Sequence, residues 1–230
     1  MRRIQFENDG YYHIYNRGLN KAPLFFDEND YLRFLWGIYY FNDSNFVPED
    51  FPYQKRYQGL ALDKNFNRKE LVNVVTWCLM PNHYHLVISQ KNENGITKFM
   101  HRLGTGYTMY INRKYESSGH VFQGTFKAKL VENNEYLQHL TRYIHLNPIN
   151  IHDPAWKERG VKNLEISKEF LLKYKWSSLR DYLNVENRFQ LTSPSFKDFL
   201  FTDDPIEYSE FLWDWLKTGI PNNFSVLSKA

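Results

Sequence analysis

The sequence has almost no cysteine and no long apolar run. Cys78 is the single cysteine among 230 residues, which excludes a disulfide framework and a zinc site built on cysteines. No stretch of about 18 apolar residues is present, so we expect no transmembrane helix. Arg2 and Arg3 are not followed by the apolar segment of a secretory signal peptide. These absences predict a cytoplasmic protein.

The sequence also has little net charge. The formal value is +3, which is too small to indicate a nucleic-acid partner by itself. The charge is unevenly distributed, because residues 91–129 carry seven basic and two acidic side chains, whereas residues 186–230 carry four basic and seven acidic ones. A basic middle and an acidic tail fit a polyanion site on one part of the molecule. They fit a solvated helix face followed by an acidic tail equally well.

The hydrophobic periodicity predicts alternating strands and helices, with no internal repeat and no low-complexity tract. Two β-rich runs flank the turn residues Met80-Pro81-Asn82 and predict a hairpin. The expected elements are a strand at 10–18, a helix at 24–41 capped by Asp27, hairpin strands at 72–79 and 83–89, a helix at 95–115, a strand at 120–131 and a helix at 133–147 capped by Asn133 or Asn134 and stopped by Pro148. This order predicts an α+β fold of the ferredoxin-like or RRM-like type, an antiparallel sheet with helices on one face.

We expect two domains. Residues 1–150 form the predicted catalytic domain, with residues 42–70 as a loop insertion because they are polar and show no clear period. Residues 151–230 form a mostly helical C-terminal extension, with helical segments near 167–183 and 205–218 separated by a loop at 192–195.

Two pairs of residues are candidates for chemistry. His83 and His85 are two positions apart on a strand and therefore point to the same face, where two imidazoles can share one metal ion. Tyr143 and Asn147 are four positions apart and lie on one helix face. Each pair has an ordinary alternative: two partly buried strand histidines, and a core tyrosine followed by a residue at a helix end.

Together, several segments resemble the HUH single-tyrosine transposases, and most closely their REP-associated branch. The similar segments are CLMPNHYHLVI, GHVFQGTFKAKLV and RYIHLNPI, together with the opening YYHIYNRGLNKAPLFFDENDYLRFL and the later YKWSSLRDYL. The resemblance covers roughly residues 10–183, with gaps in 42–70. The chain departs from the family at 103–107, where family members often have a more basic helix.

The resemblance implies a role for each pair. His83 and His85 would bind a divalent metal, Mg²⁺ or Mn²⁺, with Asn147 as a third ligand. Tyr143 would be the catalytic nucleophile that forms a 5′-phosphotyrosine with single-stranded DNA carrying an imperfect hairpin. The longer tail of this branch favours a monomer, although a dimer is possible, and the activity implies association with the nucleoid. No general base for Tyr143 is evident.

For DNA binding we expect basic and polar side chains to contact phosphates, with exposed aromatic residues stacking on bases. A solvated surface position is an equally good reading of each lysine. The candidates are Asn16, Arg17, Arg102, Arg113, Lys114, Lys127 and Lys129.

Two other functions remain open. One is a catalytically inactive nucleic-acid-binding protein of the same fold, and the other is a metal-dependent hydrolase that uses His83 and His85 without a covalent step. Tyr107 and Tyr110 are weaker candidates for the nucleophile, because their helix contains two glycines. Cys78 is expected to be a buried apolar side chain.

Overall fold

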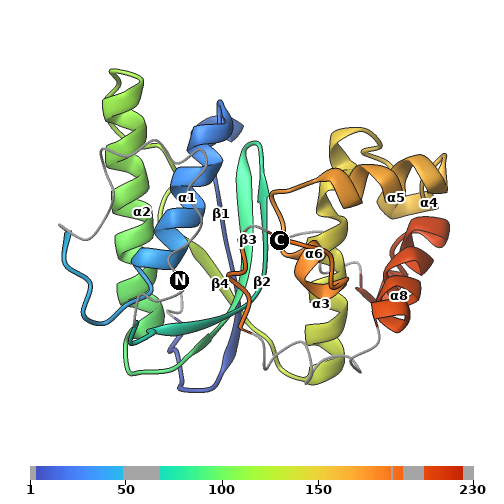
Figure 1. The fold of residues 1–230 in the computed structure, drawn as a ribbon, viewed down its shortest axis with the longest axis horizontal. Helices are drawn as coiled ribbons and strands as arrows, with labels where there is room; N and C mark the ends of the chain where they lie inside the picture. Colours follow the sequence, from blue (N-terminus) through green and yellow to red (C-terminus); the bar gives the residue numbers. More distant parts are fainter. Residues whose placement is uncertain (1–3, 49–67, 188, 194–204, 225–230) are drawn as a thin grey trace. The chain divides into compact units, whose positions relative to one another are not determined.

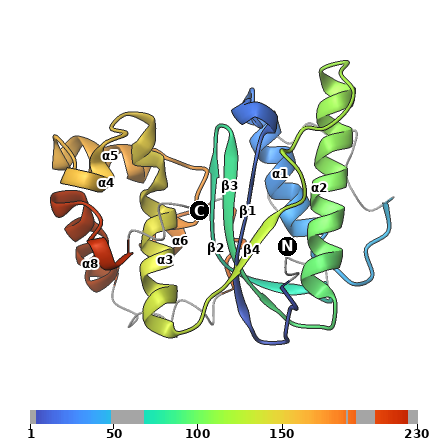
Figure 2. The same ribbon diagram turned by 180° about the vertical axis from the view of Figure 1, so that it is seen from behind.

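Four strands form one sheet in the order β2-β3-β1-β4 (Figures 1 and 2). The computed structural model describes residues 4–48, 68–187, 189–193 and 205–224. β1 pairs antiparallel with both β3 and β4, and β3 follows β2 after a two-residue turn. The strands are β1 (Tyr11–Arg17), β2 (Val72–Met80), β3 (His83–Gln90) and β4 (Lys127–Leu130).

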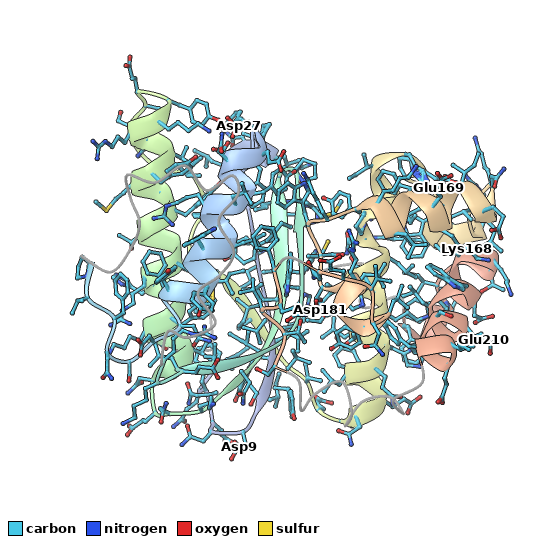
Figure 3. The ribbon with its side chains drawn as sticks, in the orientation of Figure 1. Asp9, Asp27, Lys168, Glu169, Asp181 and Glu210 are labelled. Carbon is cyan, nitrogen blue, oxygen red and sulfur yellow. The ribbon has the colours of Figure 1, made fainter. Side chains whose placement is uncertain are left out.

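Two helices, α1 (Glu28–Tyr40) and α2 (Gly95–Lys114), lie side by side against the sheet. Phe34 of α1 joins them, since its ring centroid is 5.0 Å from those of Tyr84 on β3 and Tyr107 on α2. Asp27 caps α1 through a complete capping box with Asp30, and Figure 3 shows it at the N-terminal end of that helix. The predicted cap and the predicted α+β class are therefore confirmed.

The chain divides into two compact units. The first contains residues 1–74 and 81–130, and the second contains residues 75–80 and 131–230. The second unit is helical: α3 (Asn134–Leu146), the 3₁₀ helix η3 (Asn147–Ile151), α4 (Trp156–Arg159), α5 (Leu164–Lys173), α6 (Leu179–Tyr182) and α8 (Pro205–Thr218). These units divide the chain at other positions than the expected boundary at residue 150.

Within the second unit, the edge of β2 is covered by the segment that leads into α6. The backbone N–H of Leu79 donates to the carbonyl of Trp176 at 2.9 Å, and that of Ser178 donates to the carbonyl of Trp77 at 3.0 Å. The hydroxyl of Tyr182 donates to the carbonyl of Val75 at 2.8 Å. These bonds satisfy backbone groups that an edge strand otherwise leaves exposed.

A buried histidine connects the elements of the second unit. His145 of α3 is fully buried, and its Nε2 lies 2.8 Å from the hydroxyls of Thr76 and Ser178. Its Nδ1 lies 2.5 Å from the hydroxyl of Tyr208 on α8. Burial lowers the pKa of His145 to about 3, so the ring is neutral in the folded protein.

One of two predicted boundaries near this point is wrong. The strand expected at 120–131 is reduced to β4, because residues 120–126 form only one isolated bridge, Gly18–Phe122, and Gly124 adopts a positive φ of 153°. The expected stop before Pro148 is confirmed, since α3 ends at Leu146 with Asn147 as its C-cap. A separate 3₁₀ helix, η3, follows with Pro148 in its first turn, where no partner for a backbone N–H is needed.

The ends of the expected 42–70 insertion lie close together, and residues 49–67 are outside the described part. The side-chain oxygen of Asn42 accepts hydrogen bonds from the backbone N–H groups of Leu71 and Val72 at 3.0 and 2.9 Å. The backbone N–H of Ser44 donates to the carbonyl of Lys69 at 2.8 Å. Among the described helices, none has the length and apolar character needed to cross a membrane.

Candidate active site

The two strand histidines point to the same face of β3. Their ring centroids are 5.1 Å apart and the ring planes are nearly perpendicular, at 88°. Tyr84, between them, points to the opposite face and packs on α1. His83 is half-buried and His85 is buried. Because β3 is an internal strand of the sheet, both imidazoles are held on a rigid support.

A second residue engages the Nδ1 atom of each ring. Nδ1 of His83 lies 2.7 Å from the side-chain oxygen of Asn82, whose amide nitrogen in turn donates to the carbonyl of Lys21 at 3.2 Å. Nδ1 of His85 lies 2.9 Å from Nε2 of His13 on β1. A metal ion bound by both rings would therefore be coordinated through Nε2. Ligand histidines are commonly held in this way by an outer partner.

His13 is the most deeply buried member of this group. Burial, and secondarily the positive charge of Lys129, lower the pKa of His13 to about 3, so its imidazole is neutral. The ring lies between His85 and Tyr15, with centroids 5.1 and 4.9 Å away. His13 is thus a neutral hydrogen-bonding partner for His85.

The donor set fits a divalent metal ion only in part. Within the described residues, no cluster of three or more His, Cys, Asp or Glu side chains is arranged to hold a metal. Two imidazoles, with an amide oxygen and waters to complete the shell, suit Mn²⁺, Co²⁺ or Zn²⁺ better than Mg²⁺, which prefers oxygen ligands. Further ligands would have to come from groups other than these four residue types.

Three of the expected DNA-binding residues share the sheet face of the histidines. Strand pairing places Arg17 opposite His83 and Tyr15 opposite His85, and residues directly opposite each other project to the same side. On β4, Lys127 lies opposite Tyr15 and Lys129 opposite His13. We call Arg17, Lys127 and Lys129 the basic strip. The ammonium of Lys127 is 5.8 Å from the centroid of the Tyr15 ring.

The other expected DNA-binding residues lie elsewhere. Asn16 points away from the histidine face, and its amide donates to the carbonyl of Gly124 at 2.9 Å. Arg102 of α2 donates to the carbonyl of Asp43 at 2.6 Å, and Lys114 of α2 lies 2.7 Å from the carboxylates of both Asp27 and Asp30. Arg113 of α2 is exposed. Since α2 packs on the opposite side of the sheet and Asn16 points to that side, none of these four residues belongs to the basic strip.

The candidate nucleophile lies in the second unit, on α3. Tyr143 is 2% exposed, and the ammonium of Lys157 on α4 donates a hydrogen bond to its hydroxyl oxygen at 3.2 Å. The same ammonium is 4.8 Å from the centroid of the Tyr143 ring, within the range of a cation–π contact.

Asn147 follows Tyr143 by one helical turn and caps the end of α3. It is 2% exposed, and its side-chain oxygen accepts a hydrogen bond from the amide of Asn150 at 3.1 Å. Its own amide nitrogen has no hydrogen-bond partner within the described residues. A buried donor without a partner is unfavourable, so this nitrogen has the capacity to donate to a further acceptor. The remaining lone pair of the oxygen suits a metal ion, and the nitrogen suits an anionic oxygen.

The rival nucleophiles are engaged elsewhere. The hydroxyl of Tyr107 donates to the carbonyl of Leu24 at 2.6 Å, and that of Tyr110 donates to the carboxylate of Asp30 at 2.9 Å. Burial, reinforced by Asp30, raises the pKa of both tyrosines. The expected burial of Cys78 is confirmed, and burial raises the pKa of its thiol. These environments disfavour all three as nucleophiles.

Sequence reasoning did not identify His13 or Lys157. The strand register that brings His13 to His85 joins residues 72 positions apart, and alternation within one strand gives no information about register. Lys157 lies on a four-residue helix of the extension, with no periodic pattern to predict it. The sequence offered one hint for each residue. His13 is a histidine in a predicted strand, and Lys157 is a lysine 14 residues after Tyr143.

Comparisons with known proteins agree with the resemblance. The family model described as "Transposase IS200 like" matches residues 54–147. A solved structure, described as a REP-associated tyrosine transposase bound to a REP hairpin, is similar in fold, with a TM-score of 0.52. That match covers 84% of this chain and 92% of the other, at 11% sequence identity. No curated protein matches the chain.

Proposed function

We propose that the protein cuts and rejoins single-stranded DNA through a covalent tyrosine intermediate, as a member of the IS200-like transposase family, whose model matches residues 54–147. One observation carries the proposal beyond family membership. His83 and His85 project from one face of an internal strand, each with its Nδ1 engaged by a neighbour, beside the basic strip. A pair of fixed imidazoles next to a row of cations suits a phosphodiester substrate.

Tyr143 is the proposed nucleophile. Its hydroxyl loses a proton to water, and the phenolate oxygen forms a bond to phosphorus while the bond from phosphorus to the 3′-oxygen breaks. The departing 3′-oxygen takes a proton from water, so the products are a 5′-phosphotyrosine and a free 3′-hydroxyl. Rejoining is the reverse reaction, in which Tyr143 leaves as the phenolate. The ammonium of Lys157, 3.2 Å from the Tyr143 oxygen, stabilises the phenolate in both directions.

We assign His83 and His85 to a divalent metal, Mg²⁺ or Mn²⁺, with the oxygen of Asn147 as the third protein ligand. When bound, the ion polarises the phosphate oxygens and balances the charge that develops there. The amide nitrogen of Asn147, which has no hydrogen-bond partner among the described residues, is assigned to a phosphate oxygen. In this assignment, the side-chain oxygen of Asn147 binds the metal and its side-chain nitrogen binds the phosphate.

The proposed substrate is single-stranded DNA that carries an imperfect hairpin. The similar solved structure is a transposase bound to a REP hairpin, and this supports the choice. The basic strip would hold phosphates, and the neighbouring Tyr15 offers a ring face for a base. We infer that the chain acts as a monomer with its own tyrosine, in the cytoplasm at the nucleoid.

A covalent adduct assay tests the proposal. Labelled hairpin oligonucleotides from the flanks of the gene are incubated with the full chain and Mn²⁺ or Mg²⁺, and denaturing gels detect DNA attached to protein. We expect an adduct with the wild-type chain and none with Tyr143→Phe or His83→Ala. Tyr136→Phe on the same helix and His120→Ala at an exposed position are the matched controls, and both should retain the adduct.

The alternative functions give different results. DNA binding without any adduct would indicate an inactive nucleic-acid-binding protein. Cleavage that survives Tyr143→Phe but not His83→Ala would indicate a metal-dependent hydrolase without a covalent step. Absence of both binding and cleavage on every flanking hairpin would contradict the assignment to DNA.

A further inference from the structure

His13 is a buried polar ring with an unusual neighbourhood. It is 1% exposed, its ring is stacked on His85 at an interplanar angle of 25°, and its Nε2 lies 2.9 Å from Nδ1 of His85. Its own Nδ1 has no hydrogen-bond partner within the described part of the chain. Burying such a group costs about 1–3 kcal/mol. An apolar side chain would avoid this cost, so the imidazole calls for a functional explanation.

The contact between the two rings has two possible arrangements. A neutral imidazole carries one proton, so one nitrogen donates and the other accepts. In the first arrangement, His85 carries its proton on Nδ1 and donates it to Nε2 of His13. In the second, Nε2 of His13 donates, and the proton of His85 must then be on Nε2. Only the first arrangement leaves a lone pair on Nε2 of His85 for a metal.

The two candidate ligand histidines differ in how their proton is fixed. The partner of His83 is the oxygen of Asn82, which can only accept, so His83 must carry its proton on Nδ1. The bond from Asn82 to the carbonyl of Lys21 holds the amide in this orientation. For His85 the partner is another imidazole. The position of the proton on His85 therefore depends on His13.

We propose that His13 is a positioning residue for metal binding: its Nε2 accepts the Nδ1 proton of His85 and holds that ring with Nε2 directed to the ion. This inference rests on the proposed function, because it assumes that His85 is a metal ligand. It adds a third histidine, outside the coordination shell, to the pair. The tautomer and the orientation of His85 are then set by a residue on the neighbouring strand.

Metal affinity tests the inference without requiring catalysis. Mn²⁺ binding to the full chain is measured from the electron paramagnetic resonance signal of free Mn²⁺. Loss of an outer partner of a ligand histidine lowers metal affinity by about 10- to 100-fold, and we expect this loss for His13→Phe, which keeps an aromatic ring but has no acceptor. His13→Gln provides an oxygen acceptor and should recover most of the affinity. His120→Gln, at an exposed position, should not change it.

The Gln variant separates positioning from packing. If His13 only fills space, the His13→Phe variant should bind Mn²⁺ as tightly as wild type, or the His13→Phe and His13→Gln variants should lose affinity equally. Either result overturns the inference. A measurement on the unsubstituted chain does not depend on how the variants fold. Long-range ¹H–¹⁵N spectra of the histidine rings with Mg²⁺ should show the His85 proton on Nδ1, and a proton on Nε2 would overturn the inference.

The adduct assay distinguishes this inference from the proposed function. A wild-type adduct combined with Mn²⁺ affinity that is insensitive to His13 overturns the role of His13 and leaves the proposed function intact. A wild-type chain that neither binds Mn²⁺ nor forms an adduct overturns both.

Discussion

A lysine ammonium in contact with a tyrosine hydroxyl addresses a difficulty specific to tyrosine nucleophiles. A free tyrosine has a pKa near 10, so little phenolate is present at neutral pH. Lys157 places a positive charge 3.2 Å from the Tyr143 oxygen in a buried setting. The backbone of Lys157 is itself held, because its carbonyl accepts a hydrogen bond from Ile220 at 2.8 Å. The C-terminal extension thereby contributes directly to the proposed chemistry.

We expect Lys157→Met to slow adduct formation by about 10- to 100-fold, because a hydrogen bond to a charged group contributes about 1.5–3 kcal/mol. Lys157→Arg keeps the charge and should lose much less. The measurement is the single-turnover rate of adduct formation at saturating DNA. Lys168→Met on α5 is the control, since Lys168 is paired with Glu165 instead. Equal rates for Lys157→Met and wild type would contradict the role of Lys157.

Buried neutral histidines also make stability depend on pH. The folded-state pKa of His145 is about 3, against about 6.5 for an unfolded histidine. Between these values the unfolded chain binds a proton that the folded chain does not. The stabilisation is therefore complete above pH 6.5 and declines as the pH falls, by about 1.4 kcal/mol per pH unit.

We expect His145 alone to make the free energy of unfolding about 2 kcal/mol lower at pH 5 than at pH 7. Urea unfolding of wild type and His145→Gln at both pH values measures this. The variant should be less stable at pH 7 but should lose less stability on acidification, because glutamine does not titrate. His120→Gln, at an exposed position, should behave as wild type. An acid-induced loss in His145→Gln as large as in wild type would disprove the assignment.

At the scale of elements, the expected DNA-binding cations fall into two groups with different surroundings, one on β1 and β4 and one on α2. The basic strip of β1 and β4 faces the same side as the histidines, whereas α2 lies on the other side of the sheet. On α2, Lys114 is paired with Asp27 and Asp30, and these carboxylates offset its charge. Of these two groups, the basic strip is the one that lies on the sheet face of the candidate metal ligands.

We expect the double variant Lys127→Gln/Lys129→Gln to weaken single-stranded DNA binding and to reduce its salt dependence. Each lost phosphate contact lowers the slope of log K against log salt by about 0.7. Fluorescence anisotropy at several salt concentrations gives both quantities. Arg113→Gln on α2 removes a charge outside the strip and should change the slope less. A larger change for Arg113→Gln would move the DNA interface to α2.

The sequence predicted the elements well where the signal depends on residues that are close together in the chain. Asp27 was identifiable as a cap, and Asn133 as one of two candidates with Asn134, because N-capping depends on residues only three positions away. Alternation along β3 placed His83 and His85 on one face for the same reason. Gly106 is different: a Cβ there would lie 2.7 Å from the Phe41 ring, so this glycine permits close packing of α2. The sequence showed only a weakened helix.

At the scale of the whole molecule, the prediction from sequence was limited by long-range pairing. The contacts His13–His85 and Thr76–His145 join residues 72 and 69 positions apart, and no local pattern reports such contacts. The resemblance to a family supplied Tyr143 and the histidine pair as candidates, but not their partners. The helix of Tyr143 forms one compact unit with residues 151–230, and the expected domain boundary at residue 150 stays a prediction.

The cis arrangement of the tyrosine is a prediction about the whole chain. We expect a mixture of the His83→Ala and Tyr143→Phe variants to form no adduct. In a monomer that uses its own tyrosine, the intact Tyr143 of one variant cannot act together with the intact His83 of the other. Gel detection of the adduct, with wild type diluted into either variant as the positive control, gives the answer. Recovery of the adduct in the mixture would show that tyrosines are supplied between chains.

The hydrogen bonds that cover the edge of β2 have a consequence for synthesis. The hydroxyl of Tyr182 that bonds to Val75 is made 107 residues later. At a translation rate of about 5–20 residues per second, this interval lasts roughly 5–20 seconds. During that time β2 can pair with β3, but the segment that leads into α6 does not yet cover its other edge. An uncovered apolar edge can pair with another chain. A ribosome that stalls before Ser178 would therefore display an aggregation-prone edge.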